Sequence, residues 1–336
     1  MKQVRDADLS GRNSFRMKVR CALFVEVETE EELQHLDWSS LPRPLLVMGG
    51  GSNLLFTRDF PGTVLHVAIG GLRYCPESGE ATLGAGVAFD AFCAWAAAEG
   101  LWGPENLSLI PGEAGAAAVQ NIGAYGVEAK DLISGIRAYD RENGVFTDID
   151  PADCAYGYRS SRFKGEWKGR YILTAVRFRL SRQPQPRLDY GGLREAVQPP
   201  LTPERIRQAV IGIRQQKLPA VEVLGSAGSF FCNPVVRRAH FDRIEAIGRA
   251  DNGPSCRVPH YAAGEDVKIP AAWLIEQCGF KGVRNGGAQV YPKQPLVIVN
   301  ASGDATPEDI IGLERQIVRR VEEKYGITLH PEVEHV

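Results

Sequence analysis

The segment from Ile110 to Gly126 most constrains what this chain can fold into. It is crowded with glycine and alanine, and it carries two side-chain amides, Gln120 and Asn121, and one charged residue, Glu113. Residues this small let a flat, phosphate-bearing ligand approach the main chain closely. The same composition is typical of a buried joint between helices, so this segment alone leaves both interpretations open.

A second glycine-rich segment, Val47–Phe56, follows an apolar run. We predict a strand over Leu45–Met48 that leads three glycines and the Ser52 hydroxyl into a turn, whose backbone N–H groups are suited to binding an anion. Leu54 stands where the last glycine of a G-x-G-x-x-G motif should be, and no Gly-Lys-Ser/Thr follows. Both the Rossmann and the P-loop interpretations are therefore excluded.

Composition predicts a soluble enzyme. The 336 residues favour about two or three domains. The formal net charge of −2 offers no basic surface, so we expect neither a nucleic-acid nor a membrane partner. The seven cysteines are scattered without a C-x-x-C pair and the six histidines form no H-E-x-x-H, so we expect no metal site. Scattered cysteines and an N-terminus without an apolar signal core lead us to expect a cytoplasmic protein.

Strands and helices alternate along the chain, which favours an α+β fold. A second strand is expected at Val64–Ile69, after a turn at Phe60–Gly62. Two amphipathic helices are predicted to begin at Thr202 and Thr306, each an N-cap followed by proline. A further helix, ended by Gly100, is predicted to bury one face made of Phe89, Phe92, Cys93, Ala96 and Ala97.

Ser229 ends a glycine turn directly before two phenylalanines. The pattern is not G-x-S-x-G and no histidine lies nearby to act as a base, so a nucleophilic serine is poorly supported. A serine hydroxyl can instead give a proton where carbanion charge appears, or it can simply cap its own turn. The residues of this segment leave these two roles open.

Further motifs accompany these in order along the chain. They comprise Asn13–Phe15, Gly49–Phe56, Ile110–Gly126, Tyr156–Phe163, Ile213–Pro219, Gly225–Pro234, Ala271–Gly282 and Pro331–Val333. Taken together, the chain resembles the UDP-N-acetylenolpyruvoylglucosamine reductase family, the flavoenzymes that complete UDP-N-acetylmuramate in bacterial cell-wall synthesis. A tyrosine loop around Tyr190 is similar to that of the longer family type. Familiar relatives carry a basic residue two places after Glu332, where this chain has Glu334.

The resemblance implies an α+β fold in which a two-part FAD-binding region of the PCMH/vanillyl-alcohol-oxidase type precedes a C-terminal α+β substrate-binding domain. The implied domains are a first FAD-binding subdomain at 1–66, a second at 67–218 and a UDP-sugar domain at 219–324. Residues 325–336 are expected to return to the flavin site.

The resemblance also implies an activity in peptidoglycan synthesis, and through it a part in cell shape and cell division. NADPH reduces bound FAD, and the flavin then returns hydride to the enolpyruvyl ether of UDP-N-acetylglucosamine. Ser229 is implied as the proton donor, assisted by Glu332 and Arg159. A guanidinium suits the substrate carboxylate because it is permanently charged and can donate two hydrogen bonds. We expect a monomer.

Binding residues follow from the same resemblance. For the flavin they are Gly49, Gly50, Gly51, Ser52 and Asn53 at the pyrophosphate, and Gln120, Asn121, Gly123, Ala124 and Tyr125 on the ring side. For the UDP sugar they are Tyr190, Lys217 and Asn233. One alternative is a flavin oxidase that uses oxygen and a small alcohol, which would not need Ser229, Lys217 and Asn233. Another is a flavin or UDP-sugar binding module without turnover, which would tolerate loss of Ser229 and Glu332.

Overall fold

The computed structural model describes residues 1–190, 192–221 and 223–336. These residues form two compact units. The first comprises Met1–Leu9, Arg20–Gly51 and Asp59–Gln216, and the second comprises Ser10–Val19, Ser52–Arg58 and Lys217–Val336. Both units mix helices and strands. The chain therefore passes from the first unit to the second directly after Gly51, the last glycine of the turn predicted from the sequence. The division at 66, 218 and 324 expected from the resemblance stays a prediction.

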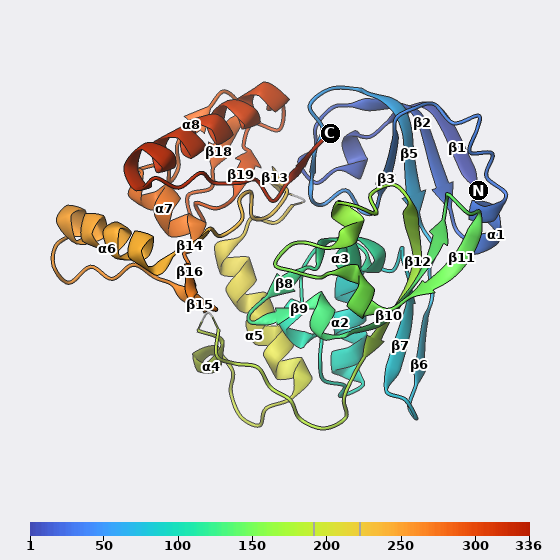
Figure 1. Cartoon of the computed structure of the whole chain (residues 1–336), viewed down its shortest axis with the longest axis horizontal. Coiled ribbons are helices and arrows are strands. Elements are labelled where there is room, and N and C mark those ends of the chain that lie inside the picture. Colours follow the sequence, from blue (N-terminus) through green and yellow to red (C-terminus); the bar gives the residue numbers. More distant parts are fainter. Residues whose placement is uncertain (191, 222) are drawn as a thin grey trace. The chain divides into compact units, whose positions relative to one another are not determined.

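The first unit contains a four-stranded sheet in the order β1-β2-β5-β3 (Figure 1). Its strands are β1 (Lys2–Asp8), β2 (Arg20–Val27), β5 (Phe60–Val67) and β3 (Leu45–Met48), and the short helix α1 (Glu30–Gln34) follows β2. The predicted strand at Leu45–Met48 is confirmed.

The strand expected at Val64–Ile69 begins earlier, at Phe60, and ends at Val67. The expected turn at Phe60–Gly62 is wrong, because Phe60 already pairs with Cys21 of β2. A register shift between Cys21 and Leu23 accommodates Pro61, which has no N–H to give to the ladder.

A second, five-stranded antiparallel sheet belongs to the same unit, in the order β11-β10-β12-β7-β6. Its strands are β11 (Val145–Ile149), β10 (Ile133–Asp140), β12 (Tyr171–Arg179), β7 (Glu80–Gly84) and β6 (Leu72–Cys75). Helix α2 (Phe89–Ala98) packs on it, with the Phe89 and Phe92 rings 5.8 and 5.1 Å from Phe178. All five residues of the predicted helix face are buried, so this prediction is confirmed.

The rest of the first unit carries the segments of interest. These are α3 (Ala114–Gln120), the hairpin β8 (Gly123–Ala124) and β9 (Val127–Glu128), and helices α4 (Leu193–Ala196) and α5 (Pro203–Lys217). Thr202 accepts a hydrogen bond from the Arg205 N–H at 3.2 Å, which confirms the predicted start of α5. Ile206 and Val210 form the buried apolar face of this helix.

The described residues of the second unit form two small sheets and three α-helices, in addition to a two-stranded pair of β20 (Glu334–His335) and β4 (Leu54–Leu55). One sheet has the order β13-β19-β18-β17 and the other β14-β16-β15. The strands are β13 (Gly225–Ser226), β14 (Val235–Val236), β15 (Tyr261–Ala263), β16 (Asp266–Lys268), β17 (Arg284–Asn285), β18 (Ala288–Val290) and β19 (Ile298–Asn300). The helices are α6 (Arg238–Asn252), α7 (Ala271–Gln277) and α8 (Pro307–Tyr325). Thr306 and Asp309 form a capping box at α8, as its sequence predicts.

Two distant segments complete the second unit. β4 (Leu54–Leu55) pairs in parallel with β20 (Glu334–His335). In the Asn13–Phe15 segment, the Ser14 carbonyl accepts from the Ser226 N–H at 2.9 Å.

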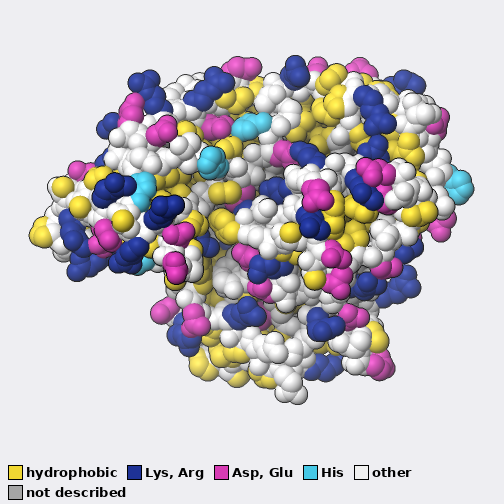
Figure 2. All heavy atoms as spheres, viewed as in Figure 1, with side chains coloured by type: hydrophobic (Ala, Val, Ile, Leu, Met, Phe, Trp, Pro, Cys, Tyr) yellow, Lys and Arg dark blue, Asp and Glu magenta, His cyan; other side chains and the backbone are white. Residues whose placement is uncertain are grey.

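The described helices include none with the length and apolar content that crossing a bilayer requires. On the face drawn in Figure 2, basic and acidic side chains are interspersed.

Candidate functional site

The glycine turn Gly49–Gly51 follows β3 in the first unit. A Cβ atom on Gly49 would lie 3.1 Å from Glu113 Oε2 and 3.2 Å from the Ala116 Cβ atom. Gly51 has φ +64°, a conformation that side-chain-bearing residues seldom adopt. The turn therefore lies close against the start of α3, and its close packing explains why the sequence places glycine here.

His66 lies against the carboxylate of Glu113, which is beside this turn. Its Nε2 lies 3.0 Å from Glu113 Oε1 and its Nδ1 lies 2.9 Å from Glu26 Oε2. The hydrogen bond to Glu113 raises the pKa of His66, and the bond to Glu26 acts in the same direction. When it is protonated, the imidazole between these two carboxylates offsets the negative charge of Glu113 next to Gly49.

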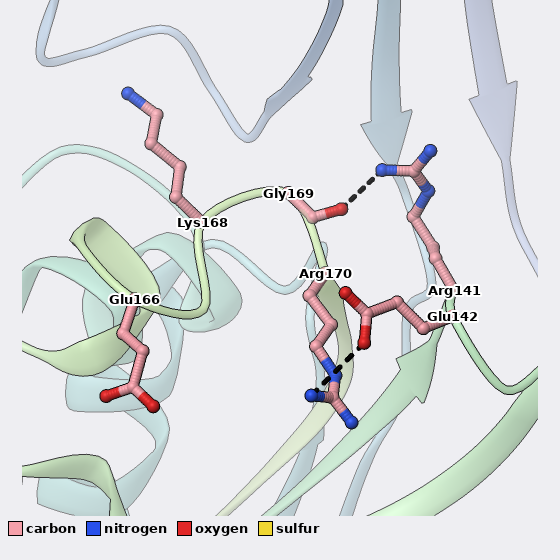
Figure 3. A pocket seen from close by; sticks show the side chains of 6 residues that line it. All are labelled: Arg141, Glu142, Glu166, Lys168, Gly169 and Arg170. Atoms are coloured by element: carbon pink, nitrogen blue, oxygen red, sulfur yellow. Dashed lines mark hydrogen bonds and ion pairs between the residues drawn. The ribbon is translucent and has the colours of Figure 1, made fainter.

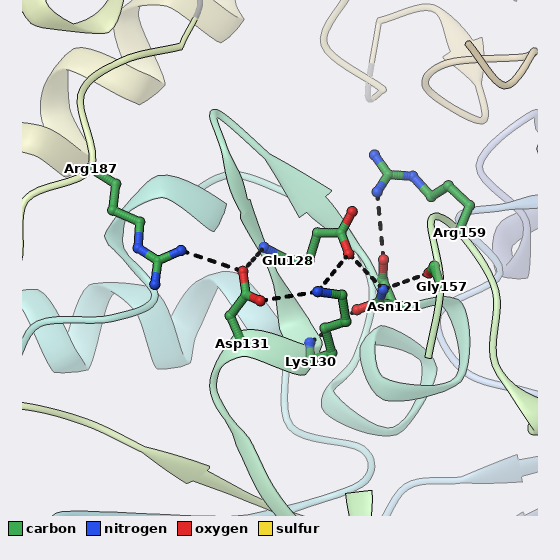
Figure 4. Close-up of polar contacts among 7 residues, drawn as sticks. All are labelled: Asn121, Glu128, Lys130, Asp131, Gly157, Arg159 and Arg187. Atoms are coloured by element: carbon green, nitrogen blue, oxygen red, sulfur yellow. Dashed lines mark hydrogen bonds and ion pairs between the residues drawn. The ribbon is translucent and has the colours of Figure 1, made fainter. Parts of the chain in front are cut away.

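Asn121 ends α3 in the left-handed conformation, with φ +45°. Its Nδ2 donates to Glu128 Oε2 at 2.9 Å and to the Gly157 carbonyl at 2.7 Å, and its Oδ1 accepts from the Lys130 N–H at 3.0 Å (Figure 4). The side chain is fully buried. It therefore holds the β8–β9 hairpin and the Gly157 loop in place.

The hairpin itself presents Tyr125. Tyr125 and Gly126 both have positive φ, +47° and +79°, as a two-residue type I′ turn requires. The Tyr125 ring meets the Tyr190 ring edge to face, with centroids 6.5 Å apart. Burial raises the pKa of Tyr125. The tyrosine predicted for the substrate thus contacts a tyrosine predicted for the flavin.

Arg159 reaches the same hairpin. Its Nη2 donates to the Gly123 carbonyl at 2.6 Å and its Nη1 lies 3.5 Å from the Asn121 carbonyl. Arg159 has φ +54°, and its guanidinium lies 5.2 Å from the centroid of the Tyr158 ring. In addition, Lys164 Nζ bridges Gln120 Oε1 and the Arg159 carbonyl, each at 3.0 Å. The first unit therefore brings Arg159 together with the residues predicted for the flavin ring.

Arg214 is not among the site residues predicted from the sequence. It lies on α5, it interacts electrostatically with Tyr125 and Arg159, and burial lowers its pKa. Among the described residues, no hydrogen-bond partner meets its buried Nε. A buried guanidinium N–H without an acceptor suits an anionic or carbonyl-bearing ligand. Its position in the Ile213–Pro219 motif is the sequence feature that could have identified it as a site residue.

Ser229 and Glu332 belong to the second unit. Ser229 follows Gly228, whose φ is +70°. The Glu332 N–H donates to the Phe230 carbonyl at 2.8 Å, and the Cys232 N–H donates to the His330 carbonyl at 3.0 Å. The serine-bearing segment and the C-terminal segment therefore pair as antiparallel strands do, with Glu332 across from the residue next to Ser229.

Asn53 holds the same C-terminal segment from another direction. Its Nδ2 donates to the Glu332 carbonyl at 3.0 Å, and its own carbonyl accepts from the Glu334 N–H at 3.0 Å. Within the second unit, the C-terminal residues therefore pair with the segment that follows the glycine turn, and their expected return to the flavin site stays a prediction. Ser52, the remaining predicted flavin residue of this segment, is half-buried.

The two residues predicted for the diphosphate and uridine region lie in different surroundings. Asn233 Oδ1 accepts from the Ala271 N–H at 2.9 Å, so it fixes the start of α7. Lys217 is the last residue of α5 and is exposed.

A surface pocket of the first unit is formed by other residues (Figure 3). It is lined by Arg141, Glu142, Glu166, Lys168, Gly169 and Arg170. Arg170 pairs with Glu142 at 3.2 Å and with Asp140 at 2.8 Å. None of the six lining residues is predicted for cofactor or substrate. Within the described residues, no group of three or more histidine, cysteine or acidic side chains is placed to hold a metal ion.

Comparison with known proteins agrees with these features. Residues 21–150 match the FAD binding domain family, and residues 219–336 match the UDP-N-acetylenolpyruvoylglucosamine reductase C-terminal domain. The fold and these matches define an FAD-containing oxidoreductase and confirm the predicted fold class. The relatives below identify the family more narrowly.

The UDP-N-acetylenolpyruvoylglucosamine reductase of Chromobacterium violaceum is 45% identical, over 97% of this chain and 97% of the relative. That of Bacteroides fragilis is 43% identical over 98% of each chain. A crystal structure of the Thermus caldophilus reductase superposes with a TM-score of 0.68 at 25% identity, over 99% of this chain and 98% of that one. This chain belongs to the UDP-N-acetylenolpyruvoylglucosamine reductase family, which confirms the resemblance.

The residues present fit the FAD that this family uses. Three consecutive glycines place peptide N–H groups on a turn against α3, where a Cβ on Gly49 would be crowded. The carboxylate of Glu113 beside them lies 3.0 Å from the His66 imidazole. The buried Nε of Arg214 provides a donor for a ligand acceptor. Each feature is suited to a polyanionic, carbonyl-bearing cofactor.

Proposed function

We propose that this chain reduces the enolpyruvyl ether of UDP-N-acetylglucosamine to UDP-N-acetylmuramate, with NADPH as the hydride donor and bound FAD as the carrier. The reaction is a step of peptidoglycan synthesis. The observation that carries the proposal is the direct pairing of the Ser229 and Glu332 segments, in a chain similar to named reductases over nearly its whole length.

When bound, FAD would supply the hydride chemistry that links NADPH to the methylene carbon of the enolpyruvyl ether. The chain's own residues manage the charge and the proton. Hydride addition places negative charge on the neighbouring carbon and its carboxylate. We assign the proton that this carbon needs to the Ser229 hydroxyl. Its position after a left-handed glycine and before a paired segment supports a fixed orientation.

Arg159 is proposed to stabilise the negative charge of the substrate carboxylate. A guanidinium stays charged and presents a planar set of donors, of which two already hold Arg159 to the Gly123 and Asn121 carbonyls. This anchoring supports a preorganised cation, because little orientation remains to be fixed during the reaction.

Glu332 is proposed to assist the proton transfer. Both of its backbone groups are held, the N–H by Phe230 and the carbonyl by Asn53. A carboxylate on so constrained a backbone is suited to orienting a hydroxyl or a substrate group.

We propose that Tyr190, Lys217 and Asn233 bind the UDP sugar. Tyr190 offers an aromatic ring already oriented by Tyr125, and Lys217 offers a flexible point charge for the diphosphate. The flavin is proposed to contact Gly49, Gly50, Gly51, Ser52, Asn53, Gln120, Asn121, Gly123, Ala124 and Tyr125. For Asn53 and Asn121 the contact would come from the backbone. The Asn53 side-chain amide donates to the Glu332 carbonyl, and the Asn121 side chain already makes three hydrogen bonds inside the first unit.

The domain division, location and assembly are also proposals. Separate sheets over Lys2–Val67 and Leu72–Arg179 support two flavin-binding subdomains at 1–66 and 67–218, followed by a sugar domain at 219–324. Scattered cysteines support a cytoplasmic enzyme. One chain carries the residues proposed for both cofactor and substrate, which supports a monomer. Through its product, the enzyme would contribute to cell shape and cell division.

Product analysis tests the activity. The purified chain is incubated with NADPH and enolpyruvyl-UDP-N-acetylglucosamine, and the UDP sugar is examined by mass spectrometry. A gain of two hydrogens in the sugar, with one NADPH consumed, is expected. NADPH oxidation that depends on oxygen and leaves the sugar unchanged would favour an oxidase instead.

A further inference from the structure

The side chain of Asn53 makes a contact outside the glycine turn Gly49–Gly51 that it follows. Asn53 stands two residues after Gly51, where the family resemblance implies that its backbone, and not its side chain, meets the flavin pyrophosphate. Its side-chain amide instead donates to the Glu332 carbonyl at 3.0 Å, across 279 residues of sequence. The backbone carbonyl of Asn53 accepts from the Glu334 N–H. Asn53 thus bonds to the residues on both sides of Val333.

Glu332 is consequently held at both of its peptide groups. Its N–H is fixed by Phe230, the residue next to Ser229, and its carbonyl is fixed by Asn53. Val333, the following residue, is buried. With the backbone tied on either side, the carboxylate has only its own side-chain torsions left to adjust. Loss of the Asn53 donor would release one of these two ties.

We propose that Asn53 is a positioning residue for Glu332, which it holds in register with the Ser229 segment. This inference rests on the proposed function, because it gives Glu332 a part in the proton step. Asn53 itself need not touch the reacting atoms. It acts through the peptide of Glu332, so its loss should affect the sugar-dependent half of the cycle and spare the NADPH-dependent half.

Thr57 provides a matched control from the same segment. Its Oγ1 donates to the Val336 carbonyl at 2.8 Å, while its N–H donates to the same oxygen. Thr57→Val and Asn53→Ala therefore each remove one side-chain bond to a C-terminal carbonyl and each leave a backbone bond in place. A general loosening of the C-terminal segment would make the two variants behave alike.

The test uses the holoenzyme in rapid-mixing experiments that follow each half of the cycle separately. We expect Asn53→Ala to slow reoxidation of the reduced flavin by the enolpyruvyl sugar about 10- to 100-fold, as a small misplacement of an oriented group does. Flavin reduction by NADPH should change less than about twofold, and so should both rates in Thr57→Val. FAD affinity of the apoprotein, measured by fluorescence quenching, should stay at the wild-type value.

A double-mutant cycle with Glu332→Gln separates positioning from other roles. If Asn53 acts through Glu332, adding Asn53→Ala to Glu332→Gln should slow the sugar-dependent step less than about twofold further. Asn53→Asp, which keeps the size but loses the donor, replaces Asn53→Ala should that variant fail to fold. Fully additive losses, equal slowing in Thr57→Val, or an unchanged sugar-dependent rate would each overturn the inference. A wild-type enzyme that does not reoxidise with the sugar would instead overturn the proposed function.

Discussion

Glu332 donates its backbone N–H to the carbonyl oxygen of Phe230 at 2.8 Å, which brings the C-terminal segment alongside the glycine turn that carries Ser229. Within the second unit, Glu332 is thereby held opposite Phe230, the residue that follows Ser229. The pairing gives the proposed proton donor and its assisting carboxylate a common, rigid support.

Ser229→Ala should leave flavin reduction by NADPH intact and slow reduction of the enolpyruvyl sugar by about 10²- to 10⁴-fold, the usual loss when a general acid is removed. The two half-reactions can be followed separately by the absorbance of the flavin. The exposed Ser39, which contacts Asp37, offers a control, and Ser39→Ala should behave as wild type. Unchanged sugar turnover in Ser229→Ala would remove this serine from the proton step.

Arg159→Lys should not restore the activity lost in Arg159→Ala. The guanidinium reaches the carbonyls of Gly123 and Asn121 at once, and a single ammonium lacks the planar arrangement of donors for this. Steady-state kcat and KM for the sugar measure the effect. As a control, Arg137→Lys alters an arginine that pairs with Glu30 and Asp148 and should leave both constants unchanged. Near wild-type values in Arg159→Lys would exclude a fork-dependent role.

Gly115→Ala should destabilise the first unit. A Cβ there would lie 2.9 Å from the Ala85 Cβ and 3.3 Å from the Ala85 carbonyl oxygen, so α3 would have to shift. We expect a loss of about 1–3 kcal/mol in the free energy of unfolding, measured with urea. Gly212→Ala on α5 meets nothing within 4 Å and should instead stabilise by about 0.5–1 kcal/mol. Equal effects of the two substitutions would contradict the close packing of α3.

The His66 bridge predicts a pH dependence of stability. Because hydrogen bonds to Glu113 and Glu26 raise the pKa of His66 in the folded state, its stabilisation is complete below the unfolded pKa of about 6.5. It is lost as the pH rises through the raised pKa. Between pH 6 and pH 9, the wild-type protein should lose about 1 kcal/mol more unfolding free energy than His66→Gln. Parallel curves for the two proteins would show that this histidine is not charged in the fold.

Local patterns made part of the fold predictable. The strand at Leu45–Met48, the buried face of α2 and the cap at Thr306 depend on apolar spacing and N-cap chemistry within a few residues. The start of β5 at Phe60 was missed because it depends on pairing with a distant strand, which overrides the local turn signal of Pro61 and Gly62.

The candidate site was predictable only in part for the same reason. The glycine turn and Ser229 stand out as motifs, but their proposed roles came from the family resemblance. The side-chain bonds of Asn121, Asn233 and Asn53 could not be foreseen, because their partners lie elsewhere in the chain. For Arg214, the motif that contains it is visible in the sequence. Its unpaired Nε–H is revealed only by the burial of the side chain in the structure.

The proposed reductase activity is tested most directly by the visible spectrum of the purified protein through one anaerobic cycle, first with NADPH and then with enolpyruvyl-UDP-N-acetylglucosamine. We expect a flavin absorbance that bleaches with NADPH and recovers when that sugar is added. Recovery with oxygen but not with the sugar, or a chain that binds no flavin on reconstitution, would contradict the proposed activity.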